Sequence, residues 1–333
     1  MAIIALNFED GLTRIIESRS SETLADAAFR AGINIPLDCN EGVCGTCKCQ
    51  WKSGHFEMGD YIEEVLSEAE VENGFSLACQ MTPTSDMVVA ILASSKACKV
   101  KAITHATTIV SIDLLSSEIV KLVVKLQKGE KLRFLQGQYA NIDIPNTGFH
   151  RSYSFSRDSG GDELEFIIKL IPNGLMSNFL REHAKVGAIL NLKGPTGSFY
   201  LRELHRPTLF FAGGTGIAPF LAMLEKLSKH KVKHPIQLFY GANAEEHLVE
   251  LERLNSFKKT MPFEYHTVSV APTPNHAQGF VNQWITKDIL KAKEYDIYIC
   301  GPNVMVESVK ASLTKAGIKI ANFYLEKFVP SGI

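Results

Sequence analysis

The sequence contains no long apolar run and no large excess of charge of one sign. A helix that crosses a bilayer needs about 20 consecutive apolar residues, and no stretch of the 333 residues reaches that length. The first apolar residues meet Asn7 and Glu9 too early to form a secretory signal peptide. No basic stripe interleaved with aromatic residues is present, so nucleic-acid binding is not expected.

The sequence also lacks an even number of cysteines; it has seven. Secreted disulfide-rich proteins pair their cysteines in an oxidising compartment. Without a signal peptide and with an odd cysteine left over, we expect a cytoplasmic protein whose thiols stay reduced. Such thiols are available to bind a metal centre.

The net charge of −1 conceals an asymmetry along the chain. Residues 1–97 hold fifteen Asp and Glu against six Lys and Arg, whereas the remainder holds twenty-one against twenty-nine. Opposite charge on a partner protein would steer its docking to the acidic segment. Acidic surface also serves solubility alone, and composition does not separate the two interpretations.

Three closely spaced cysteines and one distant cysteine dominate the acidic segment. They are Cys39, Cys44, Cys47 and Cys79. The spacing Cys-x4-Cys-x2-Cys with a remote fourth thiol is the plant-type 2Fe-2S pattern, in which one loop supplies three ligands. Gly42 and Gly45 permit left-handed backbone, which lets amide N–H groups point at the cluster sulfurs and tune the potential. Zinc sites and buried thiols are the alternatives, but zinc favours paired short spacings.

The rest of residues 1–97 is expected to form short strands and short helices. A hairpin is expected over 3–8 and 13–16, around an Asp-Gly turn. A helix capped by Thr23 follows, and a second short helix begins at 67–70. This mixture resembles the β-grasp fold of plant-type ferredoxins. Cys49 is expected to pack in the core, and residues 94–99, including Cys98, to form a linker.

Residues 102–204 are rich in strands that Gly and Pro punctuate, at 107–112, 119–126, 139–144, 164–170 and 189–192. That pattern favours a small antiparallel barrel. Inside it lies Arg151-Ser152-Tyr153-Ser154-Phe155-Ser156. This stretch resembles the Arg-x-Tyr-Ser flavin motif of the ferredoxin–NADP reductase superfamily, although alone it also fits an ordinary strand with a surface arginine.

The resemblance implies roles for the residues of this motif. Arg151 and Ser152 would hold the pyrophosphate of FAD, Tyr153 would lie beside the isoalloxazine, and Ser154 would hydrogen-bond flavin N5. Upstream, residues 137–139 resemble the lead-in Gly-Gln-Tyr of the same family. Further cofactor positions implied by the resemblance are Lys169, Gly174, Met176 and Ser177, the last three in a Gly-x-x-Ser turn that opens a helix at Ser177.

From residue 207 onward strands and helices alternate, which predicts a parallel sheet covered on both faces. Strands are expected at 208–211, 236–240, 263–270, 296–299 and 322–325, and helices at 220–229, 246–257, 281–291 and 304–315. The first strand leads into a glycine turn of the Gly-x-Gly-x-x-Pro type, which lets backbone approach a dinucleotide. Its residues are Gly213, Gly214, Thr215, Gly216 and Pro219.

Two later segments also match the superfamily. Cys300-Gly301-Pro302 resembles its Cys-Gly-Pro strand end near the nicotinamide, although a buried structural thiol is an equal alternative. Glu326-Lys327-Phe328 resembles the terminal segment that covers the flavin, so Glu326 and Phe328 become candidates for the hydride site; core packing is the alternative for Phe328. Gly241 and Glu245 follow the second strand, where an acid repels a 2′-phosphate and accepts from a ribose hydroxyl. This predicts NADH rather than NADPH.

Three modules in this order resemble the reductase component of aromatic-ring-hydroxylating dioxygenases, of the benzoate/anthranilate type. The resemblance implies a ferredoxin domain at 1–97, a linker at 98–104, an FAD-binding barrel at 105–205 and an NAD-binding α/β domain at 206–333. NADH would deliver two electrons, FAD would release them singly, and the 2Fe-2S cluster would reduce the Rieske centre of a terminal oxygenase. A reductase of a di-iron monooxygenase, or an electron carrier that does not oxidise NADH, are the alternatives.

Overall fold

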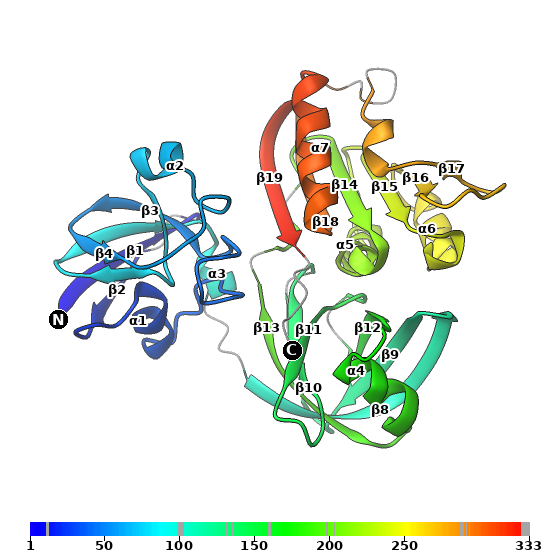
Figure 1. The fold of residues 1–333 in the computed structure, drawn as a ribbon, viewed down its shortest axis with the longest axis horizontal. Helices are drawn as coiled ribbons and strands as arrows, with labels where there is room; N and C mark the ends of the chain where they lie inside the picture. The colour runs from blue at the N-terminus through cyan, green and yellow to red at the C-terminus, as the bar shows by residue number, and fades with distance from the viewer. Residues whose placement is uncertain are drawn as a thin grey trace. The chain divides into compact units, whose positions relative to one another are not determined.

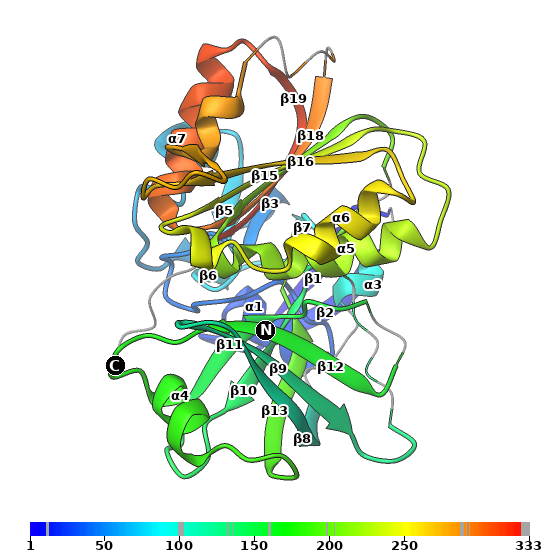
Figure 2. The ribbon, with the colours of Figure 1, turned by 90° about the vertical axis from the view of Figure 1, so that its right-hand side faces the viewer.

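The computed structural model describes residues 1–10, 13–98, 103–130, 132, 134, 136–158, 161–197, 199–202, 204–286, 290, 292 and 294–327. The chain divides into two compact units (Figures 1 and 2). The first contains Met1–Ile103 with Gly194–Ser198, and the second contains Thr104–Lys193 with Phe199–Ile333. No helix in the described ranges is long and apolar enough to cross a membrane.

The first unit is built on a five-stranded sheet of order β2-β1-β7-β3-β5. Its strands are β1 (Ala2–Phe8), β2 (Thr13–Ser18), β3 (Lys48–Ser53), β5 (Phe75–Leu77) and β7 (Met87–Ile91). The predicted β1–β2 hairpin is antiparallel, whereas β1 and β7 run parallel. A small pair, β4 (Phe56–Met58) and β6 (Met81–Pro83), lies apart from this sheet. The expected β-grasp arrangement is confirmed.

Short helices complete the first unit. In α1 (Leu24–Arg30) the Thr23 side chain accepts from the Asp26 amide, and the apolar face packs into the core. In α2 (Glu68–Glu72) Ser67 and Glu70 form a reciprocal capping box. Residues 94–99 were expected to form a linker; of these, Ser95–Cys98 form the short helix α3, and Cys98 is buried in the core.

The second unit begins with a six-stranded antiparallel barrel of order β11-β10-β13-β8-β9-β12. Its strands are β8 (Ile103–Ser116), β9 (Ile119–Leu126), β10 (Tyr139–Asp143), β11 (His150–Ser154), β12 (Glu163–Lys169) and β13 (Ile189–Thr196). An isolated antiparallel bridge between Phe155 and Phe166 joins the two ends of the sheet. Both rings are fully buried, and Phe134 stacks on Phe155. The closing point of the barrel therefore directly follows Ser154.

A parallel sheet of order β17-β16-β15-β14-β18-β19 forms the other half of the second unit. Its strands are β14 (Thr208–Gly213), β15 (Ile236–Ala242), β16 (Phe263–Ser269), β17 (Ala277–Gln278), β18 (Glu294–Gly301) and β19 (Lys319–Lys327). Alternate strand residues bury opposite faces. Phe210 and Leu238 pack with α5 (Ala218–Ser228) and α6 (Leu251–Lys258), whereas Phe211 and Phe239 pack with α7 (Asn303–Lys315). Figure 2 shows these helices on the two sides of the sheet.

One expected helix is largely replaced. Residues 281–291 were expected to be helical, but the described part forms only the short 3-10 helix η4 (Val281–Trp284). Val281 and Ile285 still bury their side chains in the core under α7. The apolar spacing therefore reflected burial, while the backbone follows the wall of a cavity described below.

Candidate functional site

The four cysteines of the 2Fe-2S pattern come together in the first unit as two pairs. Cys39 lies within hydrogen-bonding reach of Cys44, and Cys47 of Cys79. Cys47 and Cys79 are buried, and Cys39 and Cys44 are half-buried. A two-iron cluster takes two thiolates on each iron, so two pairs of cysteines fit such a cluster.

Backbone amides of the cysteine loop point at the sulfurs. The Glu41 amide donates to Cys39 Sγ over 3.4 Å, and the Gly42 and Thr46 amides donate to Cys79 and Cys44. Gly42 and Gly45 both have φ +72°, as the sequence predicted for a loop that turns its N–H groups inward. Donors aimed at sulfur stabilise negative charge there, which raises the potential of a bound cluster.

The same contacts shift the pKa values of the thiols. Burial raises the pKa of Cys44 to about 11. The hydrogen bond with Cys79 raises the pKa of Cys47, and the hydrogen bond from Cys47 lowers the pKa of Cys79 to about 6. By contrast, Cys49 is fully buried on β3 and its Sγ faces the Ser76 carbonyl at 3.7 Å, which is core packing.

The flavin motif occupies β11, which pairs antiparallel with β10. Arg151 is half-buried and donates to its neighbouring carbonyl at His150, and Ser152 donates to Asn141 Oδ1 over 2.6 Å. Tyr153 packs against the barrel core, and its burial raises the pKa of the phenol. Ser154 is buried at the end of the strand. Because successive side chains of a strand point to opposite faces, Arg151 and Tyr153 lie on one face of β11, and Ser152 and Ser154 on the other.

The Gly-x-x-Ser turn forms, but its helix begins earlier than expected. α4 (Leu175–Asn178) starts just after Gly174, not at Ser177, and a π-helix (Phe179–His183) continues it. Ser177 Oγ accepts from the Ile171 amide over 2.9 Å, so the side chain fastens the turn. A Cβ on Gly174 would lie 2.6 Å from Ile171. Met176 is buried in the barrel core. The free N–H groups of this first turn still form an anion-binding end.

Three predicted residues from distant parts of the second unit converge on one carboxylate. Ser154 Oγ donates to Glu326 Oε2 over 3.0 Å, and Cys300 Sγ lies 3.5 Å from the same oxygen. Cys300 and Glu326 are register partners on the adjacent parallel strands β18 and β19. Burial, and then the nearby carboxylate, raise the pKa of Cys300 well above its ordinary value. Cys300 is therefore a thiol at neutral pH.

The glycine turn lies beside this cluster at the carboxyl end of β14. Gly214–Ile217 form a 3-10 turn, and Pro219 lies in the first turn of α5, as predicted. A Cβ on Gly216 would lie 2.3 Å from the Cys300 carbonyl oxygen, and one on Gly301 would lie 3.2 Å from Gly213 Cα. Only glycine therefore lets the two strand ends meet.

A cavity of about 530 Å³ opens at these strand ends, the usual ligand position in an open parallel sheet. Predicted residues that line it are Lys169, Gly213, Gly214, Thr215, Gly241 and Pro302. Sequence reasoning missed Asn243, His247, Phe280 and Asn282, which also line it. Asn243 and His247 flank the predicted Glu245, so their position after β15 was an available signal. The 3-10 helix η4 supplies Asn282, which explains its departure from a long helix.

The predicted residues Gly216, Pro219, Cys300 and Gly301 are absent from the described residues that line the cavity, and so is Glu245. It accepts from Thr273 and, over 2.5 Å, from Asn275 Nδ2, and the hydrogen bond from Thr273 is the main cause of its lowered pKa. These hydrogen bonds hold the carboxylate of Glu245, which lies between Asn243 and His247 in the sequence. Phe328 lies outside the described residues.

The barrel with its Arg-x-Tyr-Ser strand, joined to a parallel sheet with a glycine turn, defines an oxidoreductase of the ferredoxin reductase class. Family models agree along the chain: "2Fe-2S iron-sulfur cluster binding domain" matches residues 7–84, "Oxidoreductase FAD-binding domain" 106–200 and "Oxidoreductase NAD-binding domain" 210–311. Among solved structures, an Amycolatopsis cytochrome P450 reductase, GcoB, is 26% identical with a TM-score of 0.78, over 99% of this chain and 100% of that one.

Relatives that match over nearly the full length of the chain identify a narrower family within this class. The chain is 45% identical to the toluate 1,2-dioxygenase electron transfer component of Pseudomonas putida and 43% identical to the 2-halobenzoate 1,2-dioxygenase electron transfer component of Burkholderia cepacia, over 98% of each chain. It is 39% identical to the anthranilate 1,2-dioxygenase component of Acinetobacter baylyi, over 98% of this chain and 97% of that one. The chain belongs to this family of dioxygenase electron transfer components, which combine 2Fe-2S, FAD and NAD domains.

Proposed function

We propose that this protein oxidises NADH and passes the electrons through FAD and a 2Fe-2S cluster to the Rieske centre of a terminal oxygenase that acts on an aromatic carboxylate. The observation that carries the proposal is the convergence of Ser154, Cys300 and Glu326 beside the nucleotide cavity. The names of the full-length relatives support the oxygenase as the destination.

The cluster is assigned to Cys39 and Cys44 on one iron and to Cys47 and Cys79 on the other. Support comes from the two thiol pairs and from the three amides aimed at them. The lowered pKa of Cys79 is in the direction that thiolate ligation requires. Burial of Cys47 and Cys79 limits access of water to one side of the cluster.

The flavin is assigned to the barrel. When bound, FAD supplies a carrier that accepts a pair of electrons and releases them one at a time. Arg151, Ser152 and the first turn of α4 would hold its pyrophosphate, and Tyr153 would offer its ring face. Ser154 has one hydroxyl proton, which it donates to Glu326 here, and the hydroxyl would turn to donate to flavin N5 when FAD binds, while Glu326 holds Cys300 in place. Because hydride transfer needs only orientation and close approach, we assign no general acid.

The nicotinamide nucleotide is assigned to the cavity at the strand ends. The backbone of residues 213–216 would face its pyrophosphate, while Gly301 and Pro302 would border the nicotinamide. Lys169 lines the same cavity from β12 and offers a cation to the phosphates, although it now lies 3.6 Å from Glu118. The fixed negative charge of Glu245 disfavours a 2′-phosphate nearby, which supports NADH over NADPH.

The partner is proposed to dock on the ferredoxin domain. Exposed acids surround the cysteine loop, namely Glu41, Asp60, Glu63 and Glu64. The Ile62 amide donates to the Gly42 carbonyl over 3.3 Å, which holds residues 60–64 against the loop. A basic surface on the oxygenase would therefore be drawn to the place where the cluster lies nearest the solvent. A cytoplasmic location, and domain limits of 1–97, 105–205 and 206–333 with a linker at 98–104, complete the proposal.

The purified protein tests the scheme directly. We expect yellow flavin and red-brown iron–sulfur absorbance, rapid bleaching by NADH, and NADH-dependent reduction of cytochrome c. The variant Cys79→Ser is expected to lose iron while its flavin is still reduced by NADH. A colourless protein would refute the whole scheme, whereas a coloured protein whose flavin is not reduced by NADH would refute the enzyme and leave only a carrier.

Reconstitution tests the destination of the electrons. Product formation from benzoate with a purified Rieske-type benzoate dioxygenase is expected, and none with a di-iron monooxygenase hydroxylase and its substrate. The opposite pattern would assign the chain to the monooxygenase systems. Raising the salt concentration should slow turnover with the oxygenase more than reduction of the flavin by NADH, because docking depends on exposed charge.

A further inference from the structure

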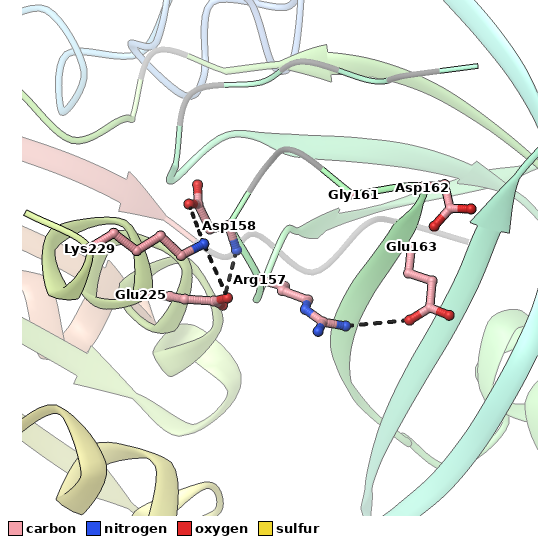
Figure 3. A pocket seen from close by; sticks show the side chains of 7 residues that line it. All are labelled: Arg157, Asp158, Gly161, Asp162, Glu163, Glu225 and Lys229. Atoms are coloured by element: carbon pink, nitrogen blue, oxygen red, sulfur yellow. Dashed lines mark hydrogen bonds and ion pairs between the residues drawn. The ribbon is translucent and has the colours of Figure 1, made fainter. Parts of the chain in front are cut away.

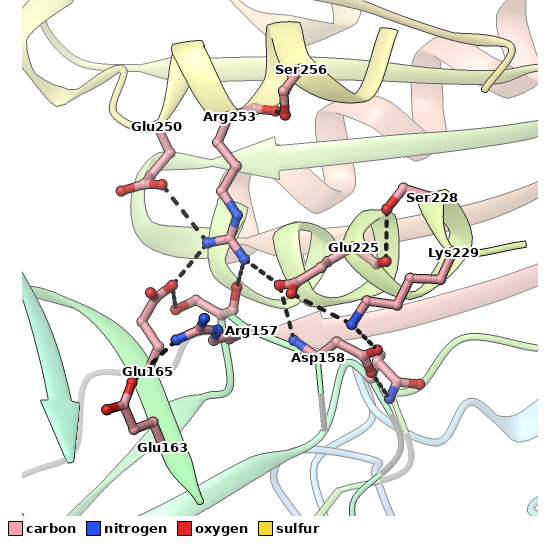
Figure 4. A network of polar contacts seen from close by, with 12 residues as sticks. Arg157, Asp158, Glu163, Glu165, Glu225, Ser228, Lys229, Glu250, Arg253 and Ser256 are labelled. Carbon is pink, nitrogen blue, oxygen red and sulfur yellow. Dashed lines mark hydrogen bonds and ion pairs between the residues drawn. The ribbon is translucent and has the colours of Figure 1, made fainter. Parts of the chain in front are cut away.

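A group of ion pairs joins the flavin-binding barrel to the nucleotide-binding half of the second unit (Figure 4). At its centre is Arg253 of α6. Its Nη1 donates to Glu165 Oε1 of β12 over 2.8 Å, and its Nη2 donates to the Ser156 carbonyl over 2.9 Å and to Glu225 Oε2 of α5 over 2.7 Å. One planar guanidinium thus binds two groups of the barrel and one of the neighbouring helix.

One acceptor of Arg253, the carboxylate of Glu165, is withdrawn from water. Glu165 is 8% exposed, and its second polar contact is the hydroxyl of the fully buried Ser156 over 2.9 Å. A carboxylate withdrawn from water in this way needs an opposite charge. Arginine suits the position because its donors form a rigid fork, whereas lysine has a single point charge.

A residue in strained backbone adjoins the same arginine. Glu250 has φ +62°, which is uncommon for a residue with a side chain. Its carboxylate lies 3.3 Å from Lys121 Nζ of the barrel and 3.8 Å from Arg253 Nη1. The start of α6 is therefore also held to the barrel by charge.

A second cross-link lies beside the first and encloses a charged cavity of about 450 Å³ (Figure 3). Lys229 Nζ of α5 lies 2.9 Å from Asp158 Oδ2, and Gln136 donates to the other oxygen of that carboxylate. The Asp158 amide donates to Glu225 Oε2, the same oxygen that Arg253 binds. Glu225 thus links the two contacts.

These contacts bind the barrel at residues that adjoin the proposed hydride site. Ser156 follows Ser154 by two residues, and between them Phe155 makes the bridge to Phe166 that closes the barrel. Glu165 is the neighbour of Phe166 and accepts the Ser156 amide through its own backbone. On the other side of the contact, the nucleotide-binding half carries the glycine turn and Cys300. A shift at Arg253 would therefore move Ser154 relative to Cys300.

We propose that Arg253 is a positioning residue for hydride transfer, which holds the flavin-binding barrel and the nucleotide-binding half at the separation that the reaction needs. This rests on the proposed function, in which FAD occupies the barrel and NADH the cavity. A misplacement of about 1 Å between reacting groups can slow a reaction roughly 100-fold. Arg253 touches neither cofactor in this assignment, so its removal leaves the ligands of both intact.

The test compares the full-length Arg253→Met and Arg253→Lys variants with Arg206→Met. Arg206 is a matched control, because it pairs with the buried Asp296 over 2.9 Å inside the nucleotide-binding half and does not reach the barrel. Stopped-flow reduction by NADH gives the limiting rate and the apparent Kd separately. The long-wavelength charge-transfer absorbance of NAD⁺ over the reduced flavin reports stacking without turnover.

Arg253→Met is expected to lower the limiting rate about 10- to 100-fold, to weaken the charge-transfer band and to leave FAD and iron content unchanged. Arg253→Lys should recover part of the rate, and Arg206→Met should retain both the rate and the band. If Arg253→Met fails to accumulate, Glu165→Gln tests the same contact with a side chain of equal shape, and a slower limiting rate is again expected.

The outcomes separate the two proposals. If NADH does not reduce the flavin of the wild-type protein, the proposed function itself is refuted. If NADH does reduce it, but Arg253→Met has the same limiting rate and charge-transfer band as Arg206→Met, only the positioning role is refuted.

Discussion

Gly42 and Gly45 lie three residues apart in the cysteine loop with the same φ of +72°, but their surroundings differ. A Cβ on Gly42 would lie 2.4 Å from the Asp60 carbonyl oxygen and 3.0 Å from Tyr61 Cα. A Cβ on Gly45 would lie 3.4 Å from Val65 Cβ, an ordinary contact. Alanine in left-handed backbone costs about 1–2 kcal/mol at either position. Only Gly42→Ala must also displace the loop, by about 1 Å relative to the 60–64 segment.

We therefore expect Gly42→Ala to lose most of its cluster, because three of the four ligands lie on the displaced loop. Gly45→Ala should keep its cluster and unfold at slightly lower denaturant concentration. Iron and acid-labile sulfide per bound FAD, measured on both purified proteins, give the comparison, since FAD serves as an internal standard in the other unit. Equal iron content in the two variants would show that overlap with Asp60 does not control cluster assembly.

Three further predictions concern the second unit. Glu326→Gln should lower the pKa of Cys300, because it removes the negative charge that adds to the effect of burial. The pH midpoint of Cys300 alkylation should then fall while staying above that of an exposed cysteine, and an unchanged midpoint would contradict the contact. Gly216→Ala should raise KM for NADH with FAD content unchanged, since its Cβ meets the Cys300 carbonyl at 2.3 Å. Gly214→Ala meets nothing within 4 Å but has φ +55°, so it should show only the smaller rise that strain in left-handed backbone produces; equal KM values for the two variants would count against the steric argument. Glu245→Arg should shift the ratio of kcat/KM values toward NADPH, and no shift would place specificity at Asn243 or His247.

The parts of the site that sequence predicted well are local. Cys39, Cys44 and Cys47 share one loop, so their spacing alone constrains what they can bind. The glycine turn before α5 is local in the same sense. Their conformations follow from φ values that glycine adopts freely, and neighbouring residues in the chain suffice to recognise them.

Other features depend on contacts that no short window of sequence contains. Ser154 and Glu326 are 172 positions apart and were grouped only through resemblance to a family. A helix was expected at 281–291, but Val281–Trp284 form a 3-10 helix at the cavity wall. Nothing beside Arg253 in the sequence marks its contacts, because its partners lie on β12 and α5.

Three donors to the cluster cysteines are the amides of Glu41, Gly42 and Thr46, while the side chains of Thr46 and Gln80 also donate. Substitution of the exposed Glu41 changes the outer face of the loop but leaves the amide of that residue in place. Homologous proteins can therefore diversify the side chains that meet different oxygenases while their clusters keep similar midpoint potentials. The side chains that recognise the partner can therefore change in evolution while the midpoint potential of the cluster stays the same.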